Sequence, residues 1–249
     1  DDTTRAFGSI SARGGDQGGH GGFVETSGHR HLDANGIAVD TFAPRGQMGT
    51  WLLDPTNIYI AVDQTTATTA GMSGTDASVD SSGPATFQAT GSTNDSLLRT
   101  STLQSNLANN SVTVSTVNNA GYGGGVIRVV SPVTWASSNS LTLSSNGSIS
   151  INAPMSATLG ALNLNAGSGY GAAITQGTGA TISAAALTAT TSANFANITL
   201  AELNNVGTAS FTAGPVGYGG NVNFTNAGAL TLGNVTASGL TVNTSNGNG

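Results

Sequence analysis

Short triplets of the form apolar–polar–apolar recur along the second half of the chain. They read LTL at 141–143, ISI at 149–151, LNL at 162–164, LTA at 187–189, ITL at 198–200, VNF at 222–224, LTL at 230–232 and LTV at 240–242. This alternation is the period-2 pattern of a strand with one buried face. Clusters of Gly, Asn, Ser and Ala, which are turn signals, separate the triplets. The pattern predicts many short strands joined by tight corners.

Two kinds of fold fit triplets spaced by about ten or twenty residues: an antiparallel sandwich or barrel, and a parallel β-solenoid. A sandwich core uses large aromatic side chains, whereas this chain is 5% aromatic and its triplets closely resemble one another. In a solenoid, like side chains stack at intervals of about 4.8 Å, so similar triplets are expected. We therefore predict an all-β parallel β-solenoid of about ten coils, with roughly 20–25 residues per coil.

One long segment interrupts the pattern. Residues 64–93 contain few apolar anchors, which predicts a loop excursion. We expect β-solenoid coils over 1–63 and 111–249, with the excursion and a short helix over 64–110. The three stretches together are predicted to form one continuous solenoid domain.

The predicted helix covers residues 101–109. Leu103 and Leu107 share a helical face at i,i+4, and Ser101 with Gln104 matches the spacing of a capping box. The asparagines that follow suit a helix end. We expect this helix to cover one flank of the solenoid.

Composition narrows the class of protein. Charged residues make up 7% of the chain, against roughly 25% in typical soluble proteins, and there is no lysine. Disordered chains combine low hydrophobicity with high net charge, whereas here the net charge is −6 and Leu, Ile and Val clusters recur. The composition thus favours an ordered, hydroxyl-rich protein. Six basic residues in an acidic chain offer no basic surface for nucleic acid.

Cysteine content, apolar runs and the first residues of the chain bear on whether the protein is exported. The chain has no cysteine, which removes disulfides and thiolate metal sites. No apolar run approaches the ~18–20 residues of a membrane-spanning helix. The polar start, DDTTRAFG, indicates that any secretion signal has been removed or lies outside this sequence.

Two blocks carry a family resemblance: GGHGGFVETSG at 18–28 and GTWLLDPTNIYI at 49–60. They resemble the large exoproteins of the filamentous haemagglutinin type, which bacteria export by two-partner secretion. The likeness continues over 103–116 and 133–155. The motif residues with a structural role are Gly21, Gly22, Phe23, Glu25, Ser27, Gly28, Trp51, Leu53, Asp54, Pro55 and Trp135.

The resemblance implies a right-handed parallel β-helix in a long secreted protein that acts in adhesion, aggregation or biofilm structure. It also implies export through an outer-membrane transporter. The secretion domain's own signature is not visible, so the resemblance implies an internal or C-terminal piece. It brings no catalytic residues to these blocks.

The glycine-rich stretch at 13–36 is the first candidate for chemistry. A P-loop needs a lysine, which the chain lacks, and no helical period follows that would suit a dinucleotide loop. The calcium-binding repeat G-G-x-G-x-D is not matched by GGDQGG either. We expect these glycines to supply positive φ at corners and close contact between coils, and we expect no cofactor.

Histidines offer a metal hypothesis. In one strand His29, His31 and Asp33 would point to the same side, and such a row suits zinc, copper or nickel. Nothing in the sequence specifies the supporting hydrogen bonds that a metal site needs. We therefore favour a solvated row without metal.

Carboxylates offer an enzyme hypothesis, since many parallel β-helices act on polysaccharides. Glycoside hydrolysis needs two carboxyl groups about 5–10 Å apart, and Asp33 and Asp40 are the best candidates. Lyase chemistry on acidic sugars also needs cations, which are scarce here. Asp54, which precedes Pro55, is expected to form an Asx-type turn instead. Other carboxylates in the first quarter are Glu25 and Asp63.

Aromatic residues and glycosylation motifs are weaker signals. Trp51 and Trp135 fit either sugar-stacking platforms or core packing, and their apolar or β-branched neighbours favour packing. In a chain so rich in Asn, Ser and Thr, chance produces N-x-S/T sequons. They include Asn109, Asn146, Asn197 and Asn234.

Three functions remain open from the sequence. The favoured one is a secreted, non-enzymatic rod on a bacterial surface or in its matrix, binding surface glycans or proteins through rows of Ser, Thr and Asn. The second is a filament subunit that stacks end to end on its own copies, because strand triplets run almost to the last residue without a cap. The third is a polysaccharide-active enzyme.

Overall fold

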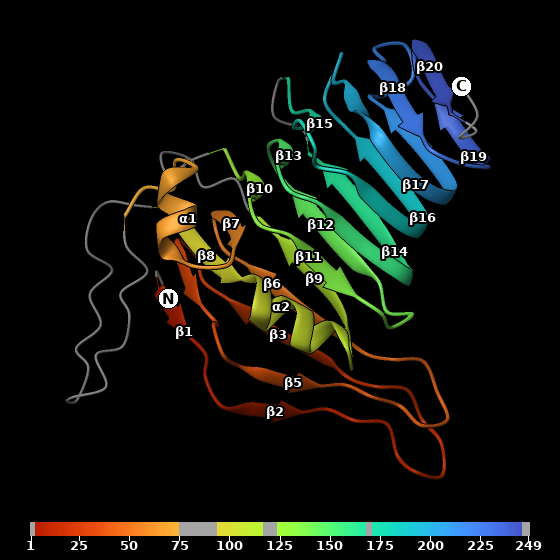
Figure 1. The fold of residues 1–249 in the computed structure, drawn as a ribbon. Helices are drawn as coiled ribbons and strands as arrows, with labels where there is room; N and C mark the ends of the chain where they lie inside the picture. The colour runs from red at the N-terminus through yellow and green to blue at the C-terminus, as the bar shows by residue number, and fades with distance from the viewer. Residues whose placement is uncertain (1–2, 75–93, 117–123, 168–170, 246–249) are drawn as a thin grey trace.

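The structure, a computed structural model, describes residues 3–74, 94–116, 124–167 and 171–245. They form a parallel β-solenoid of about eight turns, in which three sheets wrap around one core (Figure 1). The predicted fold class is therefore confirmed. The turns are fewer than the ten expected, and among the described residues no strand lies between Ala61 and Asp95.

Sheet 1 is the broadest of the three. Its strands pair in parallel from one coil to the next, with one register shift, between Ala209 and Phe211, in the last pair. In stacking order they are β3 (Phe23–Ser27), β6 (Thr50–Asp54), β9 (Ser111–Ser115), β12 (Leu141–Ser145), the second parts of β14 (Met155–Ala166) and β16 (Ile182–Thr191), the last part of β17 (Ile198–Ala213), and β19 (Thr231–Thr236).

Sheet 2 follows sheet 1 around the first corner of each coil. Its elements in stacking order are β1 (Thr3–Arg5), β4 (His31–Asp33), β8 (Asp95–Arg99), β7 (Asn57–Ala61), β10 (Ile127–Val129), β13 (Ile149–Ile151), β15 (Ile174–Gln176), the first part of β17, β18 (Asn221–Asn226) and β20 (Gly239–Thr244). β8 thus lies before β7 in the stack although it follows β7 in the sequence.

Sheet 3 completes the coil and contains a helix. In stacking order it consists of β2 (Ser9–Ser11), β5 (Ala38–Asp40), α2 (Thr100–Leu107), β11 (Val133–Trp135), the first parts of β14 and β16, and the middle of β17. The remaining helix, α1 (Gln64–Thr69), lies outside the sheets and packs against β7.

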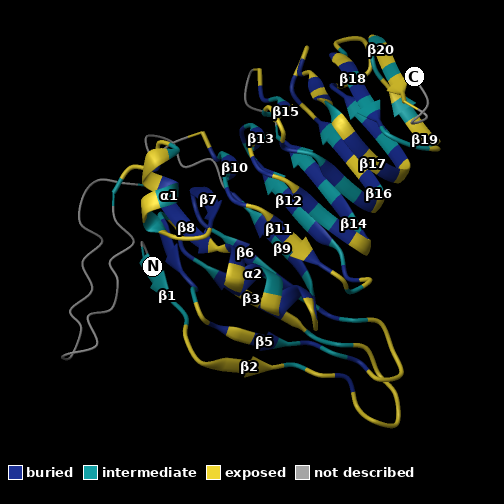
Figure 2. Cartoon of the chain, in the orientation of Figure 1, coloured by how far each residue is buried: buried dark blue, intermediate teal, exposed yellow. Residues whose placement is uncertain are grey.

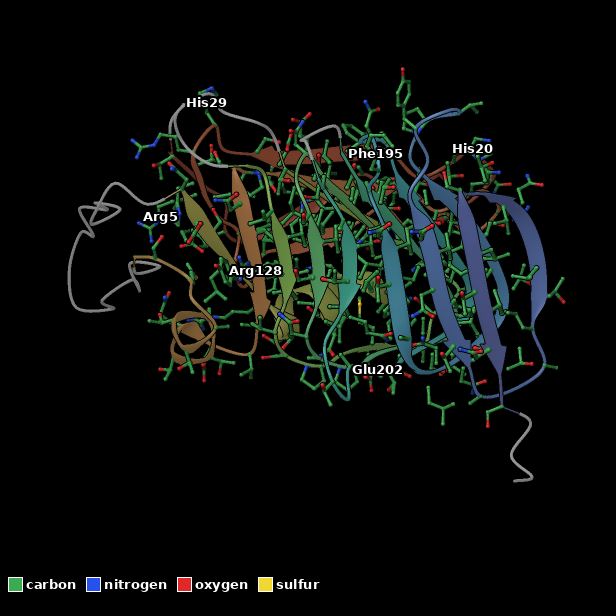
Figure 3. The ribbon with its side chains drawn as sticks, turned by 90° about the horizontal axis from the view of Figure 1, so that it is seen from above. Arg5, His20, His29, Arg128, Phe195 and Glu202 are labelled. Atoms are coloured by element: carbon green, nitrogen blue, oxygen red, sulfur yellow. The ribbon has the colours of Figure 1, made fainter. Side chains whose placement is uncertain are left out.

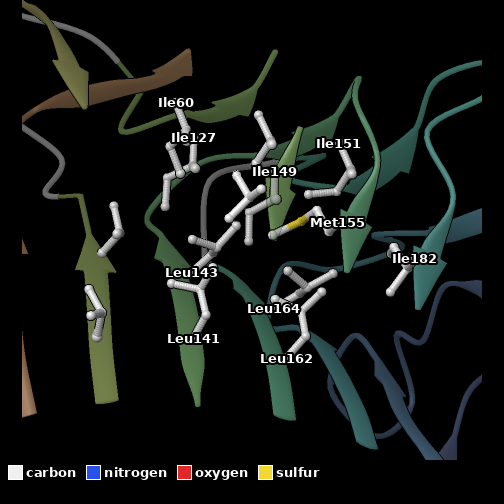
Figure 4. Packing of buried hydrophobic residues seen from close by; sticks show 14 of the residues in the cluster. Ile60, Ile127, Leu141, Leu143, Ile149, Ile151, Met155, Leu162, Leu164 and Ile182 are labelled. Atoms are coloured by element: carbon white, nitrogen blue, oxygen red, sulfur yellow. The ribbon is translucent and has the colours of Figure 1, made fainter. Parts of the chain in front are cut away.

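The core is made of stacked columns of like side chains. One column in sheet 2 runs through Ile58, Ile127, Ile149, Ile174 and Ile198, each aligned with the next. Figure 4 shows the isoleucines and leucines of neighbouring coils packed against one another. Figure 2 shows buried positions alternating with more exposed ones along strands such as β12 and β18. The predicted triplets from 141–143 to 222–224 form these columns because every second side chain of a strand points inward. In the last two triplets Leu232 and Leu240 are exposed instead.

α2 replaces two strands in sheet 3. Two strands, β6 and β9, lie between β3 and β12 in sheet 1, and two, β8 and β7, lie between β4 and β10 in sheet 2. In sheet 3, α2 alone lies between β5 and β11 (Figure 1). Two strand spacings of about 4.8 Å nearly equal the ~10 Å diameter of a helix with its side chains. The helix therefore takes up the same height along the solenoid axis as the two strands in each of the other sheets. The coils after the insertion can then stack in the same register on all three sides.

Polar side chains of α2, and of Asn110 just past its end, make the hydrogen bonds to β5 that a neighbouring strand would make. Asn106 Oδ1 accepts from Val39 N at 2.6 Å, and Asn106 Nδ2 donates to Ile37 O at 2.9 Å. Asn110 repeats the arrangement one step along: its Nδ2 donates to Val39 O at 2.7 Å and its Oδ1 accepts from Thr41 N at 2.6 Å. The edge of β5 is therefore satisfied by amides instead of by backbone.

Three sequence-based predictions about this insertion were wrong in detail. The helix covers no flank, since it lies within sheet 3 with Leu103 and Leu107 fully buried in the core. It begins at Thr100, and Arg99 caps it without a side-chain bond, so no capping box forms. Gln104 instead accepts a hydrogen bond from Thr134 N, across the boundary to β11.

The predicted loop excursion begins as a helix. Asp63 caps α1 by accepting a hydrogen bond from Thr66 N at 2.8 Å, and Ala67 packs against Tyr59 and Leu97. Residues 75–93 of the excursion lie outside the described residues. Within the described part of the chain, no helix is long and apolar enough to cross a membrane.

Candidate functional site: the outward rows of sheet 1

Sheet 1 carries two parallel rows of hydroxyl and amide side chains on its outer surface. We call these the hydroxyl rows. The strand register aligns each member with the next, at one residue per coil. The first row is Thr113, Thr142, Asn163, Thr188 and Ser210, and the second is Ser115, Ser144, Asn165, Thr190 and Thr212.

The spacing of the hydroxyl rows follows from strand geometry. Members of one row are about 4.8 Å apart along the solenoid, and the two rows are about 6.8 Å apart along the strands. The apolar residues between them point inward and are buried, which holds the outward side chains in place; they are Val114, Leu143, Leu164, Ala189 and Phe211. Asn163 Nδ2 also donates to Thr142 Oγ1 at 3.3 Å. The arrangement is a regular grid of hydrogen-bond donors and acceptors.

Charge is confined to the N-terminal end of this surface. Beyond Arg128 the sequence contains one charged residue, Glu202. Glu202 belongs to another part of the coil, where its carboxylate accepts from Gly179 N at 2.8 Å. The hydroxyl rows are therefore suited to neutral ligands, since they offer no ion pair.

Two carboxylates mark the N-terminal end of the rows. Glu25 accepts a hydrogen bond from the Ser27 hydroxyl at 2.7 Å, and Asp54 is aligned with Ser27 in the adjacent strand. Burial raises the pKa of the Asp54 carboxyl above its ordinary value of 3.8; a hydrogen bond from Ser115 partly opposes the rise and the Glu25 charge adds to it. Asp54 Oδ1 is buried without a hydrogen-bond partner among the described residues. The predicted Asx-type turn is thus replaced by a contact between coils.

Asp54 makes a testable contribution to the pH dependence of stability. A carboxyl whose pKa is raised on folding destabilises the folded state when ionised, and this cost disappears as the pH falls through the raised pKa. We expect Asp54→Asn to raise the thermal midpoint near neutral pH. The gap between variant and wild type should narrow as the pH falls towards about 4, near the unfolded pKa of an aspartate.

Asp40 provides a control for which the expected change in stability has the opposite sign. A hydrogen bond from Phe42 N and the Arg13 guanidinium lower the pKa of Asp40, so its stabilising effect is present above pH ~4 and is lost as the pH falls through the lowered pKa. Asp40→Asn should therefore lower the midpoint near neutral pH. Thermal unfolding of both variants between about pH 4 and neutral pH measures whether each midpoint lies above or below that of the wild type. A change in the same direction for both variants would contradict the opposite pKa shifts of Asp54 and Asp40.

The histidine row of the metal hypothesis does not form. His29 lies exposed in the bend before β4, whereas His31 and Asp33 are buried in β4 itself. His31 Nδ1 is 3.1 Å from Asp95 O, and Asp33 contacts Arg5 and Asn35. Among the residues that the structure describes, no three His, Asp or Glu side chains are grouped to hold a metal ion.

The two carboxylates of the enzyme hypothesis lie on different sheets. Asp33 belongs to sheet 2, where the Nε of Arg5 is 3.8 Å away, and Asp40 belongs to sheet 3, where it pairs with Arg13. Each arginine comes from the coil before, in register with its aspartate for the first pair. The structure therefore joins each carboxylate to a neighbouring coil and does not bring the two together.

The glycines of the first block serve the two purposes expected of them. Gly18, Gly19 and Gly36 have positive φ in the corners. Gly21 does not, but a Cβ atom there would overlap the carbonyl oxygen of Thr41 in the next coil. This close approach is why the block needs glycine at that position.

The tryptophans of the resemblance belong to the core. Trp51 is fully buried and donates from Nε1 to Thr26 Oγ1 at 3.0 Å, while Trp135 is 4% exposed and donates to Asn139 O at 2.9 Å. Leu53 is also buried. Packing, and not sugar stacking, thus accounts for both tryptophans. Phe23, by contrast, is 63% exposed.

One exposed aromatic pair escaped the sequence analysis. Phe195 and Tyr218 meet at the corner between sheets 1 and 2, with ring centroids 5.9 Å apart. The available signal was the tripeptide Gly-Tyr-Gly, which occurs at 121–123, 169–171 and 217–219 at equal spacing. The first occurrence and part of the second lie outside the described residues.

Comparison with known proteins adds no family assignment. No protein-family model matches the sequence, and neither a curated protein nor a solved structure matches it significantly. What the residues and the geometry establish is the fold: a parallel β-solenoid with a grid of neutral hydrogen-bonding side chains on sheet 1.

Proposed function

We propose that this chain is a β-helical segment of a secreted, non-enzymatic protein of the filamentous haemagglutinin type, acting in adhesion, aggregation or biofilm matrix at a bacterial surface. The observation that carries the proposal is the pair of hydroxyl rows, which align hydroxyls and amides over successive coils without a charge. Its partners are neutral glycans or proteins of neighbouring surfaces, and export uses an outer-membrane transporter.

The rows support adhesion through many weak contacts. A hydrogen bond exposed to water contributes about 1 kcal/mol or less, so one hydroxyl holds nothing by itself. A grid that repeats along the solenoid lets a polymeric ligand make several contacts at once, and their combined effect is far larger. Since no charge takes part, binding is expected to change little between low and high salt.

The experiment places positive charge in the grid. The double variant Thr142→Lys/Thr188→Lys alters two members of the first row that are two coils apart. Its matched control is Ser150→Lys/Thr199→Lys, which has the same separation on the outer surface of sheet 2. Binding to immobilised neutral polysaccharides and aggregation of the producing cells are measured for both.

The proposal predicts that the sheet 1 variant loses about tenfold or more in binding, while the sheet 2 control keeps it. Equal binding by both variants would show that the hydroxyl rows do not carry the contact. No binding and no aggregation by the unaltered chain would refute the adhesive function itself.

A second candidate function is a filament subunit, and the ends of the solenoid favour it. β1, β2 and β3 each pair on one side, and so do β19 and β20, so both ends present strand edges among the described residues. Leu232 and Leu240 are partly exposed at one end. Further coils of the same polypeptide or another copy can continue these edges; a filament requires the second.

Electron microscopy tests the filament. Long fibres should form from the unaltered chain and be lost in Leu240→Lys, which puts a charge in the stacking surface, but not in the outward control Thr241→Lys. Single short rods from the unaltered chain at high concentration would rule out end-to-end stacking.

A further inference from the structure

Phe195 has an unusual backbone for a bulky residue. Its φ of 57° makes it the one non-glycine residue in the left-handed region among those that the structure describes. That conformation is strained for a side chain of this size and persists only where the surroundings impose it. Phe195 as a whole residue is 61% exposed, so burial of its side chain does not offset the strain. Strain of this kind is a reason to look for a function.

Tyr218 completes an aromatic pair with Phe195. The Phe195 N–H donates to Tyr218 O at 2.7 Å, and the two rings meet edge to face at an interplanar angle of 86°. Tyr218 is itself 55% exposed, in a turn closed by its N–H to Pro215 O at 3.0 Å. The pair therefore places two exposed aromatic residues side by side, with their rings nearly perpendicular.

The pair stands on a closely packed base. Ala193 and Ala196 are buried beneath it and belong to one small cluster with Ala172. Gly220, just past the tyrosine turn, leaves no room for a Cβ atom because the carbonyl oxygen of Ala196 lies against it. The two corner loops are thus held together, and the rings are positioned before any ligand arrives.

The surroundings of the pair are uncharged and include both amide side chains and the exposed Val216 of the tyrosine loop. The exposed Asn194 and Asn197 lie in the loop of Phe195, and the exposed Asn221 begins β18 just after the loop of Tyr218. Asn197 Oδ1 accepts from Asn221 N at 2.8 Å. The one charged residue in this half of the sequence, Glu202, lies on the opposite side of the molecule in Figure 3. An anionic headgroup or an acidic polymer would lack a cation here, so the surface suits a neutral ligand with both apolar and hydroxyl groups.

We propose that Phe195 and Tyr218 form a stacking subsite for a neutral pyranose unit of a glycan. The C–H face of a sugar ring packs on an aromatic ring, and its hydroxyl groups bond to the amides around it. This inference rests on the proposed adhesive function and names its ligand class. The subsite lies at the end of the strands that carry Thr190 and Thr212, so a glycan bound there extends over the hydroxyl rows.

The experiment removes the rings and keeps the fold. Phe195→Gly deletes one ring and also relieves the strain, because glycine adopts this φ freely; its thermal midpoint should be unchanged or higher. Tyr218→Ala deletes the other ring, and Tyr218→Phe retains it. Leu159→Ala is the matched control, since Leu159 is an equally exposed apolar residue at a different corner. The probes are neutral gluco-, galacto- and manno-trisaccharides, with trigalacturonate as the acidic comparison, in calorimetric titrations.

The expected result is that Phe195→Gly and Tyr218→Ala each weaken neutral-sugar binding about tenfold, while Tyr218→Phe and Leu159→Ala keep it. Unchanged binding in the ring-deletion variants would overturn the subsite. If Thr142→Lys/Thr188→Lys still abolishes binding in that case, the proposed adhesive function holds and only the aromatic subsite is rejected. Preference for trigalacturonate overturns the subsite as well. So does self-association of the chain, seen by size-exclusion chromatography, that disappears in Phe195→Gly, since a second copy is then the occupant.

Discussion

Replacing Asn106 with alanine is expected to lower the free energy of unfolding by about 2–6 kcal/mol. The side-chain amide of Asn106 accepts a hydrogen bond from Val39 N and donates one to Ile37 O. Asn106 itself is 2% exposed. Alanine leaves both backbone groups buried without a partner, and each such group costs about 1–3 kcal/mol. Urea unfolding followed by circular dichroism measures the loss.

The control for this variant is Asn109→Ala. Asn109 occupies the same helix end but is exposed, and its replacement should change stability by about 0.5 kcal/mol or less. Equal effects at the two positions would mean that Asn106 does not hold the edge of β5. A loss confined to Asn106 supports the replacement of two strands by one helix, since only the buried face of α2 bonds to β5.

Replacing Trp51 with alanine is the second change with a large expected effect, about 3–5 kcal/mol of stability. Its indole is fully buried, aligned between Val24 and Val112 of the neighbouring coils, and its Nε1–H is bonded to Thr26. Alanine leaves a cavity that stacked coils cannot close, because strand pairing on both sides fixes their spacing.

Trp51→Phe separates volume from hydrogen bonding. Phenylalanine keeps most of the packing and should cost less than half as much as alanine, by roughly 1–2 kcal/mol. Trp135 remains as the single tryptophan in both variants, so its fluorescence reports unfolding. A Trp51→Ala variant as stable as wild type would contradict the core position and reopen the sugar-platform interpretation.

Local patterns predicted the strands well. The triplets at 141–143, 149–151 and 162–164 lie in β12, β13 and β14, with their apolar members buried. Alternation is a property of adjacent residues, so it is visible without knowledge of the fold. The solenoid followed from similarity between triplets, since stacking like on like requires it.

The helix was recognised, but its place in the fold was not. Leu103 and Leu107 predicted one buried face correctly. A neighbouring stripe, formed by Thr102, Asn106 and, just past the helix end, Asn110, is buried as well, which a helix on a flank would not require. This polar stripe at i, i+4 and i+8 was the available signal for a helix inside a sheet. These side chains bond to the backbone at the edge of β5, which lies more than sixty residues earlier in the chain, so the sequence around the helix does not reveal their partners.

For the candidate sites, too, the sequence showed which residue types are present, and the structure showed which of them lie together. The sequence showed that Ser, Thr and Asn abound and that charge is scarce beyond Arg128. Register placed ten of those side chains in two aligned rows, which composition alone does not specify. The aromatic pair depended on a contact between two corner loops, Phe195 N to Tyr218 O, of neighbouring coils.

By itself, then, the sequence determined which residues form strands, which side chains point inward, and that like coils stack on like. These properties arise from the two-residue period of a strand and from repetition along the chain. Only the tertiary structure decided where the 64–110 insertion goes, because that depends on one helix diameter nearly matching two strand spacings. It also decided which polar side chains share a surface, since each coil supplies one member of a row and the register between coils brings the members together.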